Sequence, residues 1–368
     1  MRILVTGSNG FIGKNLILRL SELGGYEIFR FTRDHSTVDL ANFVSKADAV
    51  VHLAGINRPI DVREFSDGNV ELTLNLCELI AGSGRNIPLI FASSIQAGLD
   101  NPYGQSKRAA ELALESLAET TGNSVTIYRL PNVFGKWCRP NYNSVLATFC
   151  HNLAHDLPIK INDAVAILKL VYVDDVVGEF ITSIDKSQAG LIRREVSPVY
   201  EVTLGALANQ IKAFQNSRDS LISEAVGTGF VRALYSTYLS YLPPTKFAYE
   251  VPKYGDERGI FVEMLKTKDS GQFSFFTAHP GVTRGGHYHH TKTEKFLVIK
   301  GSARFGFRQI LTNEFYEIVT SGDKPEIVET VPGWTHDITN IGSDEMIVML
   351  WANEIFDRAH PDTVAEKV

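Results

Sequence analysis

The sequence predicts an α/β part, built on a doubly wound parallel sheet with a substrate lobe, followed by an all-β part that is a small β-barrel or a jelly roll. Three observations predict this architecture. A glycine-rich turn follows the first apolar run, and buried apolar runs alternate with helical patterns up to about residue 240. Beyond it, short strand patterns recur between glycine-bounded turns. Because residues 241–246 include two prolines that block a helix, we place the boundary there and predict parts spanning 1–243 and 244–368.

Composition and charge narrow the class of protein. The chain has 368 residues, of which 44% are apolar and 21% charged, so two or more globular domains with sizeable cores are expected. The net charge of −6 does not indicate a nucleic-acid partner, which would favour a basic protein. Three cysteines without metal-type spacing favour a reducing, cytoplasmic location. We see no signal-peptide pattern and no run of about 18 apolar residues, so we expect neither export nor a membrane partner.

The first predicted strand leads into a glycine-rich loop. Residues 2–6 are predicted to form a buried strand, and residues 14–23 have a helical pattern. The order of strand, glycine turn and helix is that of a Rossmann-type dinucleotide-binding fold. Glycines let backbone N–H groups at a helix N-terminus approach a pyrophosphate. We therefore predict cofactor contacts from Gly7, Asn9, Gly10, Phe11, Ile12 and Gly13.

The second predicted strand, residues 26–32, ends before Arg33. NAD-specific proteins usually carry an acidic residue at this position, which binds the ribose 2′-hydroxyl. A cation instead suits the 2′-phosphate of NADP, so Arg33 favours NADPH as cofactor. The alternative is a solvated surface arginine, since Asp34 is adjacent.

A third buried strand is predicted to end at His52 and to be followed by Leu53, Ala54 and Gly55. The small residues leave room for a cofactor to pass, so we predict that Leu53, Ala54 and Gly55 bind it. We expect His52 to be a structural residue near the cofactor.

The fourth predicted strand, residues 88–94, brings Ser93 and Ser94 to the edge of the sheet where α/β proteins bind ligands. Tyr103 and Lys107 follow, four residues apart on one face of a predicted helix. The ammonium is expected to lower the pKa of the phenol and make Tyr103 a proton donor near neutrality. A serine hydroxyl would hold the substrate oxygen. This spacing is common on helix surfaces, but its place after the glycine loop favours catalysis.

A histidine-rich stretch lies in the predicted jelly roll. His287 and His289 are two residues apart on a predicted strand, so their side chains are expected to face the same cavity. Glu294 could return to that cavity from the next strand, and His336 could supply one more nitrogen. Imidazole and carboxylate together suit zinc or another first-row divalent ion.

Residues 1 to about 240 resemble the extended short-chain dehydrogenases/reductases that act on nucleotide sugars. The resemblance implies a catalytic triad of Ser94, Tyr103 and Lys107, of which the last two also contact the cofactor. Only eight residues separate Ser94 from Tyr103, fewer than is usual in the family, so Ser93 remains an alternative. The matching motifs are Gly7-x-x-Gly10-x-x-Gly13, His52-Leu-Ala-Gly55, Asn69, Ser93-Ser94, Tyr103-x-x-x-Lys107, Arg129-Leu-Pro-Asn-Val-Phe-Gly135 and Val171-Tyr-Val-Asp174-Asp175.

The same resemblance implies where the substrate binds. Asn132, Lys136 and Arg139 lie where the family places contacts with the nucleotide sugar. We therefore predict that these three residues bind the substrate.

The histidine stretch resembles the first cupin motif, and Pro332-Gly333-x-x-His336 resembles the second. The resemblance implies a metal site, with zinc as the expected ion. Its ligands would be His287, His289, Glu294 and His336, and His290 could replace one of them.

The second part also resembles the 3,5-epimerases of nucleotide 6-deoxy-4-ketosugars. That resemblance implies that His287 is the base next to the ketone and that Lys295 stabilises the enolate oxygen. Arg258 and Glu263 would help to hold the nucleotide sugar. A nitrogen bound to a metal cannot also take a proton, so His287 is either a ligand or the base. If it is the base, His290 fills the vacant ligand position. The matching segments are Asp256-Glu-Arg258-Gly259-Ile-Phe261-Val-Glu263, Arg284-Gly-Gly-His287-Tyr and Lys295-Phe-Leu-Val-Ile-Lys-Gly301.

The combination of both parts resembles the CapF-type bifunctional enzymes of capsular polysaccharide synthesis. It implies a UDP-linked 2-acetamido-2,6-dideoxy-4-hexulose that is epimerised at C3 and reduced at C4 with NADPH. The product would be UDP-2-acetamido-2,6-dideoxy-L-talose, a precursor of UDP-N-acetyl-L-fucosamine. Since cupins often pair, a homodimer is expected. The alternatives are a reductase whose cupin only dimerises the protein or senses a ligand, a cupin without chemistry, and a non-catalytic NADP sensor.

Overall fold

The structure is a computed structural model, and two compact units are recognisable in it. Unit 1 comprises residues 1–134, 142–144 and 168–201, and unit 2 comprises residues 135–141, 145–167 and 202–368. Unit 2 thus combines helices of the expected substrate lobe with the strands that follow them. The boundary at 243/244 stays a prediction. The structure describes residues 1–58, 61, 65–251, 253–256, 259–262, 265–267, 271–354 and 359–368.

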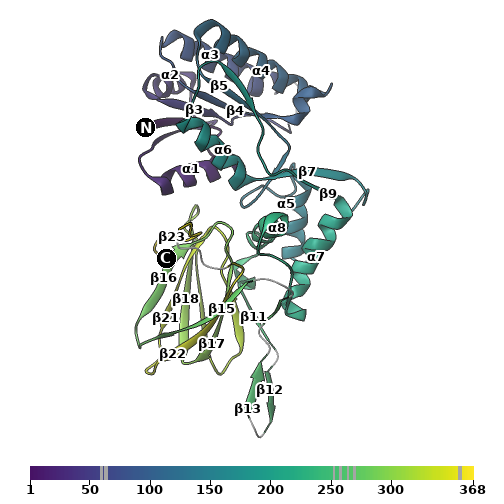
Figure 1. Ribbon diagram of the computed structural model, residues 1–368, viewed down its shortest axis with the longest axis vertical. Helices are drawn as coiled ribbons and strands as arrows, with labels where there is room; N and C mark the ends of the chain where they lie inside the picture. Colours follow the sequence, from purple (N-terminus) through teal and green to yellow (C-terminus); the bar gives the residue numbers. More distant parts are fainter. Residues whose placement is uncertain are drawn as a thin grey trace. The chain divides into compact units, whose positions relative to one another are not determined.

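Unit 1 is built on a parallel sheet with the strand order β2-β1-β3-β4-β5-β8 (Figure 1). All neighbouring strands are parallel. The chain order reverses between β1 and β3, which are paired up to Thr6 and His52, and ligands bind at such a switch point. The predicted doubly wound sheet is confirmed. The strands are β1 Arg2–Thr6, β2 Glu27–Phe31, β3 Ala49–His52, β4 Leu89–Ser94, β5 Val125–Leu130 and β8 Leu191–Arg194.

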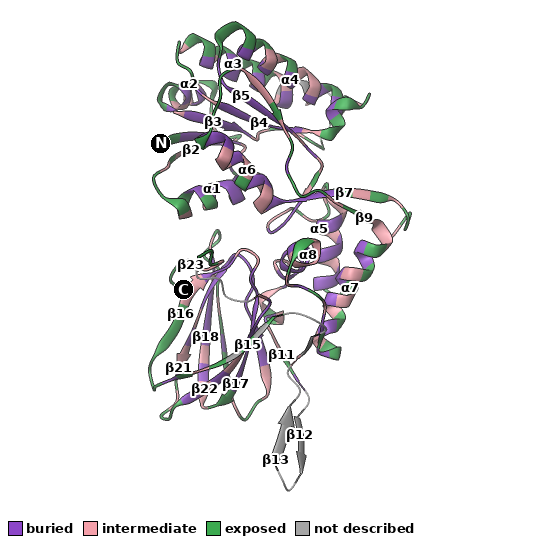
Figure 2. Cartoon of the chain, in the orientation of Figure 1, coloured by how far each residue is buried: buried purple, intermediate pink, exposed green. Residues whose placement is uncertain are grey.

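Helices cover the central strands of unit 1. The residues of β3 and nearly all of β4 are buried, as expected for parallel strands packed on both faces (Figure 2). In the longest helix, Asn101 caps the N-terminus by accepting from Gly104 N at 2.8 Å, and Pro102 takes the first helical position. The helical segments are α1 Phe11–Leu23, α2 Thr37–Lys46, η1 Ser66–Glu71, α3 Leu72–Gly82, η2 Ile95–Gly98, α4 Pro102–Thr121 and α6 Val173–Asp185.

Unit 2 begins with helices that pack on one another. Each buries an apolar face, and α7 is capped by Thr203, whose hydroxyl accepts from Ala206 N at 3.2 Å. The helical segments are α5 Val145–Ala154, α7 Leu204–Ser220, α8 Gly229–Leu239 and η3 Pro244–Lys246. A small separate sheet, most of whose residues belong to unit 1, is formed by β6 Asn132–Phe134, β7 Ile167–Tyr172 and β9 Tyr200–Thr203.

The rest of unit 2 is a jelly roll of two antiparallel sheets (Figure 1). Aromatic side chains fill the space between them, with the Phe296 ring 5.6 Å from Phe305 and 6.4 Å from Phe276. This confirms the predicted all-β part. The first sheet orders β11 Ala248–Glu250, β20 Glu326–Glu329, β17 Glu294–Lys300, β22 Met346–Ala352 and β15 Gln272–Ala278. The second orders β19 Phe315–Ser321, β18 Ser302–Gln309, β21 Trp334–Asn340, β16 Thr283–Tyr288 and β23 Val364–Ala365. Short pairs are β10 Ile222–Ser223 with β14 Lys266–Thr267 and β12 Lys253–Asp256 with β13 Gly259–Val262.

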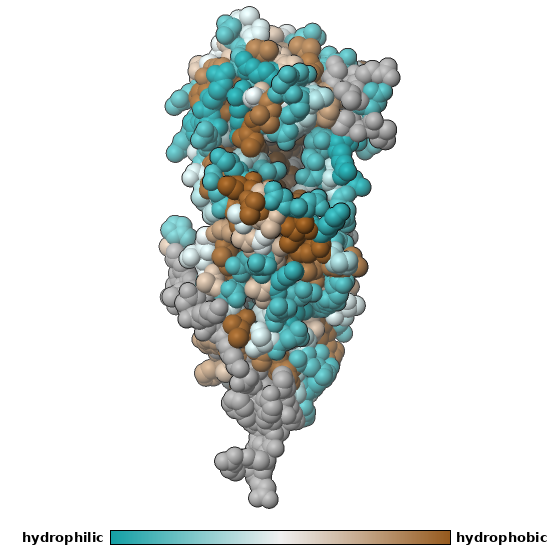
Figure 3. Space-filling view, turned by 90° about the vertical axis from the view of Figure 1, so that its right-hand side faces the viewer, coloured by the Kyte–Doolittle hydropathy of each residue, from teal (hydrophilic) through white to brown (hydrophobic). Residues whose placement is uncertain are grey.

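Among the described residues, no helix is both long and apolar enough to cross a membrane. On the face drawn in Figure 3, hydrophobic residues form separate groups among hydrophilic ones.

Candidate active sites

The glycine loop of unit 1 lies close against the turn that follows β3. Gly7 has a φ of +65°, and a Cβ atom there would lie 2.7 Å from Ala54 N. A Cβ at Gly13 would lie 2.5 Å from Gly7 O. Both positions therefore require glycine, because backbone atoms cannot move aside as a side chain can. The helix that follows starts at Phe11 without a side-chain cap, so its first N–H groups can bind an anion.

Thr6 and His52 hold this turn in place. The Thr6 hydroxyl accepts from the N–H groups of Leu53 and Ala54, both at 3.1 Å, and therefore donates to His52 Nδ1 at 2.7 Å. His52 Nε2 then donates to Thr73 at 2.9 Å. Burial lowers the pKa of His52 to about 3, so the ring is neutral. These contacts agree with the structural role expected for His52, and the residues fit a dinucleotide.

Arg33 lies just beyond β2 with an exposed side chain. Its neighbour Asp34 accepts a long hydrogen bond of 3.4 Å from the hydroxyl of Thr32. The acidic residue is thus turned toward its own loop, and the role of Arg33 in binding a 2′-phosphate stays a prediction.

Ser94 and Tyr103 come together at the carboxyl end of β4. The hydroxyl groups are hydrogen-bonded, which lowers the pKa of Tyr103, but burial raises it more. Ser93 instead donates to Glu111 Oε1 at 2.6 Å inside unit 1. Of the two serines left open by the sequence, the geometry therefore favours Ser94 as the partner of Tyr103.

Lys107 does not act on Tyr103 as expected. Its ammonium donates to Ala92 O at 3.0 Å and lies 4.8 Å from the ring of Phe91, and the pKa of Tyr103 is raised rather than lowered. The expected lowering was wrong for the described structure because burial of the phenol outweighs the hydrogen bond. Burial also lowers the pKa of Lys107 to about 8, which Glu111 opposes.

Glu111 was not singled out by the sequence, although it lies one helical turn after Lys107. Its carboxylate is fully buried and accepts from Arg129 Nε at 2.9 Å, from Arg129 Nη2 at 2.6 Å and from Arg108 at 3.1 Å. The spacing of four residues between Lys107 and Glu111 could have indicated that the two charged side chains lie on the same face of the helix.

The predicted substrate residues lie in different places. Asn132 belongs to unit 1 and donates to Lys169 O at 3.4 Å. Lys136 and Arg139 belong to unit 2; Lys136 is buried with its ammonium 5.4 Å from the ring of Trp137, whereas Arg139 is exposed. Their role in binding substrate stays a prediction. The other two predicted residues, Arg258 and Glu263, lie outside the described residues.

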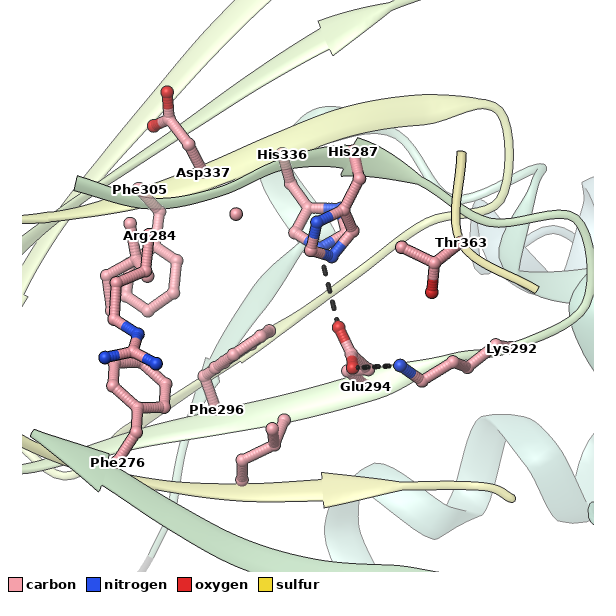
Figure 4. A pocket seen from close by; sticks show the side chains of 13 residues that line it. Phe276, Arg284, His287, Lys292, Glu294, Phe296, Phe305, His336, Asp337 and Thr363 are labelled. Carbon is pink, nitrogen blue, oxygen red and sulfur yellow. Dashed lines mark ion pairs between the residues drawn. The ribbon is translucent and has the colours of Figure 1, made fainter. Parts of the chain in front are cut away.

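Four side chains in the jelly roll form a candidate metal centre. One ligand atom each of His287, His289, Glu294 and His336 lies within 4.8 Å of all the others. Glu294 Oε2 is 3.2 Å from His289 Nε2 and 3.5 Å from His336 Nε2. Figure 4 shows the rings of His287 and His336 above the Glu294 carboxylate. The residues come from β16, the turn after it, the start of β17, and β21.

The protonation states of this cluster suit a metal. Burial, together with His336 and His289, lowers the pKa of His287 to about 3, and burial also lowers the pKa of His336. Burial acts to raise the pKa of Glu294, but hydrogen bonds with His289 and His336 bring it well below its usual value. Neutral imidazoles and an ionised carboxylate are the forms that bind metal. Three nitrogens and one oxygen in a buried site fit zinc.

His290 is not part of this cluster. Its ring lies 5.7 Å from the ring of Tyr288, and its N–H donates to Asp362 Oδ1 at 2.9 Å. His290 lies apart from the clustered side chains because the chain turns here and presents His289 and Glu294 instead, and its role as a replacement ligand stays a prediction.

A cavity of about 370 Å³ lies beside the cluster (Figure 4). The Lys292 ammonium enters it and lies 2.7 Å from Glu294 Oε1. At the other end, the Arg284 guanidinium lies 5.1 Å from the ring of Phe276. Lys292 was missed by the sequence analysis, although its place two residues before Glu294 was a signal. The lining residues are Phe276, Arg284, Gly285, His287, Lys292, Glu294, Phe296, Phe305, His336, Asp337, Ile338, Leu350 and Thr363.

Lys295 does not line this cavity, and its role next to the substrate stays a prediction. Adjacent strand residues point to opposite faces, so Lys295 points away from the side that Glu294 faces. Its ammonium pairs with Glu329 and lies 3.2 Å from the hydroxyl of Tyr249. Arg218 of α7 pairs with the same carboxylate. Burial and the charge of Arg218 lower the pKa of Lys295 well below its usual value.

Comparison with known proteins groups this chain with enzymes of nucleotide-sugar metabolism. Two family profiles match, "NAD dependent epimerase/dehydratase family" over residues 3–197 and "Polysaccharide biosynthesis C-terminal domain" over residues 254–364. A UDP-2-acetamido-2,6-beta-L-arabino-hexul-4-ose reductase from Pseudomonas aeruginosa is 60% identical over 99% of this chain and 98% of its own. The crystal structure of the capsular polysaccharide assembling protein CapF from Staphylococcus aureus matches with a TM-score of 0.68 at 42% identity, covering both chains completely. The chain belongs to the CapF family.

Membership of the CapF family confirms the resemblance drawn from the sequence motifs. The family profile over residues 3–197 implies a nicotinamide cofactor for the glycine loop. A UDP-glucuronic acid 4-epimerase from Bacillus cereus, solved in complex with NAD, matches only 59% of this chain at 18% identity, with a TM-score of 0.53 over 84% of its own length. That likeness shows the fold of the first part alone, whereas the CapF likeness extends through the jelly roll.

Proposed function

We propose that this protein acts on one UDP-linked sugar at two sites. The substrate would be a UDP-2-acetamido-2,6-dideoxy-4-hexulose, epimerised at C3 in the jelly roll and reduced at C4 with NADPH in unit 1. The observation that carries the reduction is the 60% identity, over 99% of the chain, to a reductase named for a sugar of this class. The product would be UDP-2-acetamido-2,6-dideoxy-L-talose, on the route to UDP-N-acetyl-L-fucosamine for capsular polysaccharide.

In the reduction, Ser94 orients the C4 carbonyl and Tyr103 gives its proton to the carbonyl oxygen. The raised pKa of Tyr103 supports this role, because the phenol keeps its proton at neutral pH. The Lys107 ammonium, close to Gly55 and the cofactor loop, binds the ribose. NADPH, when bound by the loop 7–13 and Arg33, supplies the hydride. Asn132, Lys136 and Arg139 are proposed to hold the nucleotide.

In the epimerisation, a proton next to the ketone is removed and returned on the opposite face. The developing enolate oxygen needs a cation, and Lys292 is proposed for this role in place of Lys295 because its ammonium lies in the cavity. His287, His289, Glu294 and His336 would hold zinc, which would supply a Lewis acid at this site.

Whether His287 is a ligand or the base is decided by zinc analysis of His287→Gln. If His287 is the base, the variant retains zinc and loses proton exchange. If it is a ligand, the variant loses zinc as well.

Exchange of the C3 proton for deuterium tests the proposal. The 4-ketosugar nucleotide is incubated with the protein in deuterated water without NADPH, and deuterium is expected at C3. NADPH oxidation that depends on the sugar is then followed separately. Reduction without C3 deuterium would leave a reductase whose jelly roll dimerises the protein or senses a ligand. If NADPH is not oxidised when the sugar is added, the proposed reductase activity is contradicted.

The proposed assembly is a homodimer located in the cytoplasm. Light scattering of the purified protein at several concentrations measures its mass, and a monomer at all of them would contradict the dimer.

A further inference from the structure

Residues 361–366, here named the return segment, form part of the wall of the metal centre. Within it, β23 pairs with β16 in an antiparallel register that sets Ala365 opposite His287. Thr363 lines the cavity next to the cluster (Figure 4). The return segment therefore lies directly beside a proposed metal ligand.

The carboxylate of Asp362 binds the turn that joins β16 to β17. Its Oδ1 accepts from His290 N at 2.9 Å, and its Oδ2 accepts from the N–H groups of Thr291 and Lys292, both at 2.7 Å. The Thr291 hydroxyl adds a fourth hydrogen bond at 2.9 Å. Charge-assisted hydrogen bonds to consecutive backbone groups fix the path of a turn. This turn carries His289 at one end and leads into Glu294 at the other.

The backbone of Asp362 acts on the ligand itself. His289 Nδ1 lies 2.5 Å from Asp362 O, and a carbonyl can only accept, so Nδ1 carries the proton. Nε2 lies 3.2 Å from Glu294 Oε2, and any proton shared by these two atoms is given up when a metal takes the Nε2 lone pair. Protonation at Nδ1 gives the tautomer in which His289 can bind a metal through Nε2.

From these contacts we infer that Asp362 is a positioning residue of the metal centre. It holds the turn between two ligands, His289 and Glu294, through its side chain, and it sets the tautomer of the His289 ring through its carbonyl. The inference rests on the proposed metal site. Residues that orient metal ligands in this way are worth roughly 10- to 100-fold in metal affinity.

The test compares Asp362→Asn with Glu366→Gln in the full-length protein. Both oxygens of Asp362 accept hydrogen bonds, so an amide must set its NH₂ group against a backbone N–H. The Glu366 carboxylate lies on the return segment too but pairs with Arg308 at 2.6 Å, away from the turn. Zinc affinity is measured by competition with a chromogenic chelator, and the absorption spectrum of the cobalt-loaded protein reports the ligand geometry. We expect Asp362→Asn to lose about 10- to 100-fold in zinc affinity with an altered cobalt spectrum, and Glu366→Gln to change neither.

The outcomes separate this inference from the proposed function. If the wild type binds zinc tightly and Asp362→Asn has the same zinc affinity and cobalt spectrum, the role of Asp362 is overturned but the metal site is not. A wild type that binds zinc no better than Glu294→Gln overturns the metal site and the inference with it. If Asp362→Asn does not fold, Thr291→Val decides instead, since it removes one hydrogen bond to the same carboxylate. A smaller loss of zinc affinity in that variant supports the inference, and unchanged affinity overturns it.

Discussion

Arg33 is the residue at which the choice between NADPH and NADH is expected to be made. Arg33→Ala removes the cation proposed to bind the 2′-phosphate. A hydrogen bond to a charged group is worth about 1.5–3 kcal/mol, so we expect the preference for NADPH over NADH to fall about 10- to 100-fold. The measurement is kcat/KM with each cofactor. Arg30→Ala, which changes an exposed arginine near the end of β2, is the matched control, and an equal change in both variants would contradict the role of Arg33.

Lys107 sets the expected pH dependence of the reduction. Its pKa is lowered by burial to about 8, so its charge is present below that pH and is lost above it. If the charged form is needed, kcat/KM for reduction falls as the pH rises through about 8.

Glu111→Gln tests this assignment. The Glu111 carboxylate raises the pKa of Lys107, so without it the fall in activity should begin at lower pH. Glu115→Gln, on the same helix but paired with Arg108 and Arg193, is the control. A pH profile that does not move in Glu111→Gln would show that the ionisation observed is not that of Lys107.

At the scale of the element, two lysines near the start of strand β17 have different surroundings. Lys292 lies in the cavity, whereas Lys295 pairs with the buried Glu329. We expect Lys292→Met to lower C3 deuterium exchange about 10²- to 10³-fold, because the cation in the cavity is lost. Lys295→Met should instead destabilise the protein by about 1.5–3 kcal/mol, since it removes one hydrogen-bonding partner of the buried Glu329 carboxylate, which still pairs with Arg218.

Denaturant unfolding and deuterium exchange, measured on both variants, separate the two effects. Lys300→Met, an exposed lysine at the end of β17, should change neither. The proposed role of Lys292 does not stand if Lys292→Met exchanges at the wild-type rate.

These two lysines also show how far the sequence could be interpreted. The glycine loop and the order of strands and helices depend on local spacing, and local spacing predicts them. Three of the four clustered residues, His287, His289 and Glu294, are also close in the sequence, whereas His336 was found through a separate motif. Lys295 was placed next to the substrate by family resemblance alone. The alternation of a strand already puts Lys295 and Glu294 on opposite faces, so the signal was present.

Other features could not be found from sequence spacing. Asp362 meets the turn after β16 from about seventy residues further along the chain, and Arg218 of α7 meets Glu329 of β20. Such contacts depend on how separate elements pack, which neither periodicity nor motif spacing encodes. The pKa of Tyr103 was missed for a related reason, because it is set by burial rather than by the nearby lysine.

For the whole molecule, the proposal implies two activities that can be lost independently. Removing the metal with a chelator should abolish C3 exchange, by at least about 100-fold, and leave the reduction of an already epimerised sugar intact. Tyr103→Phe should do the reverse, with a loss of about 10²- to 10⁴-fold in reduction and normal exchange.

Both activities are measured on the same preparation, by deuterium incorporation and by NADPH oxidation. Tyr26→Phe, which removes a hydroxyl bonded to Asp185 in unit 1, is the control for loss of a phenol. Loss of both activities in Tyr103→Phe would mean that the two sites are not independent.

The ion pairs around Glu329 limit how the protein can be cut into pieces. Arg218 and Tyr235 lie before the predicted boundary at 243/244, whereas Glu329 and Lys295 lie after it. A fragment beginning at residue 244 would leave the buried Glu329 carboxylate without Arg218 and Tyr235. It would also expose the surface that α7 and α8 cover. The jelly roll is therefore better studied in the full-length protein, because α5, which packs on α7 and α8, lies before residues 168–201 of unit 1 in the chain.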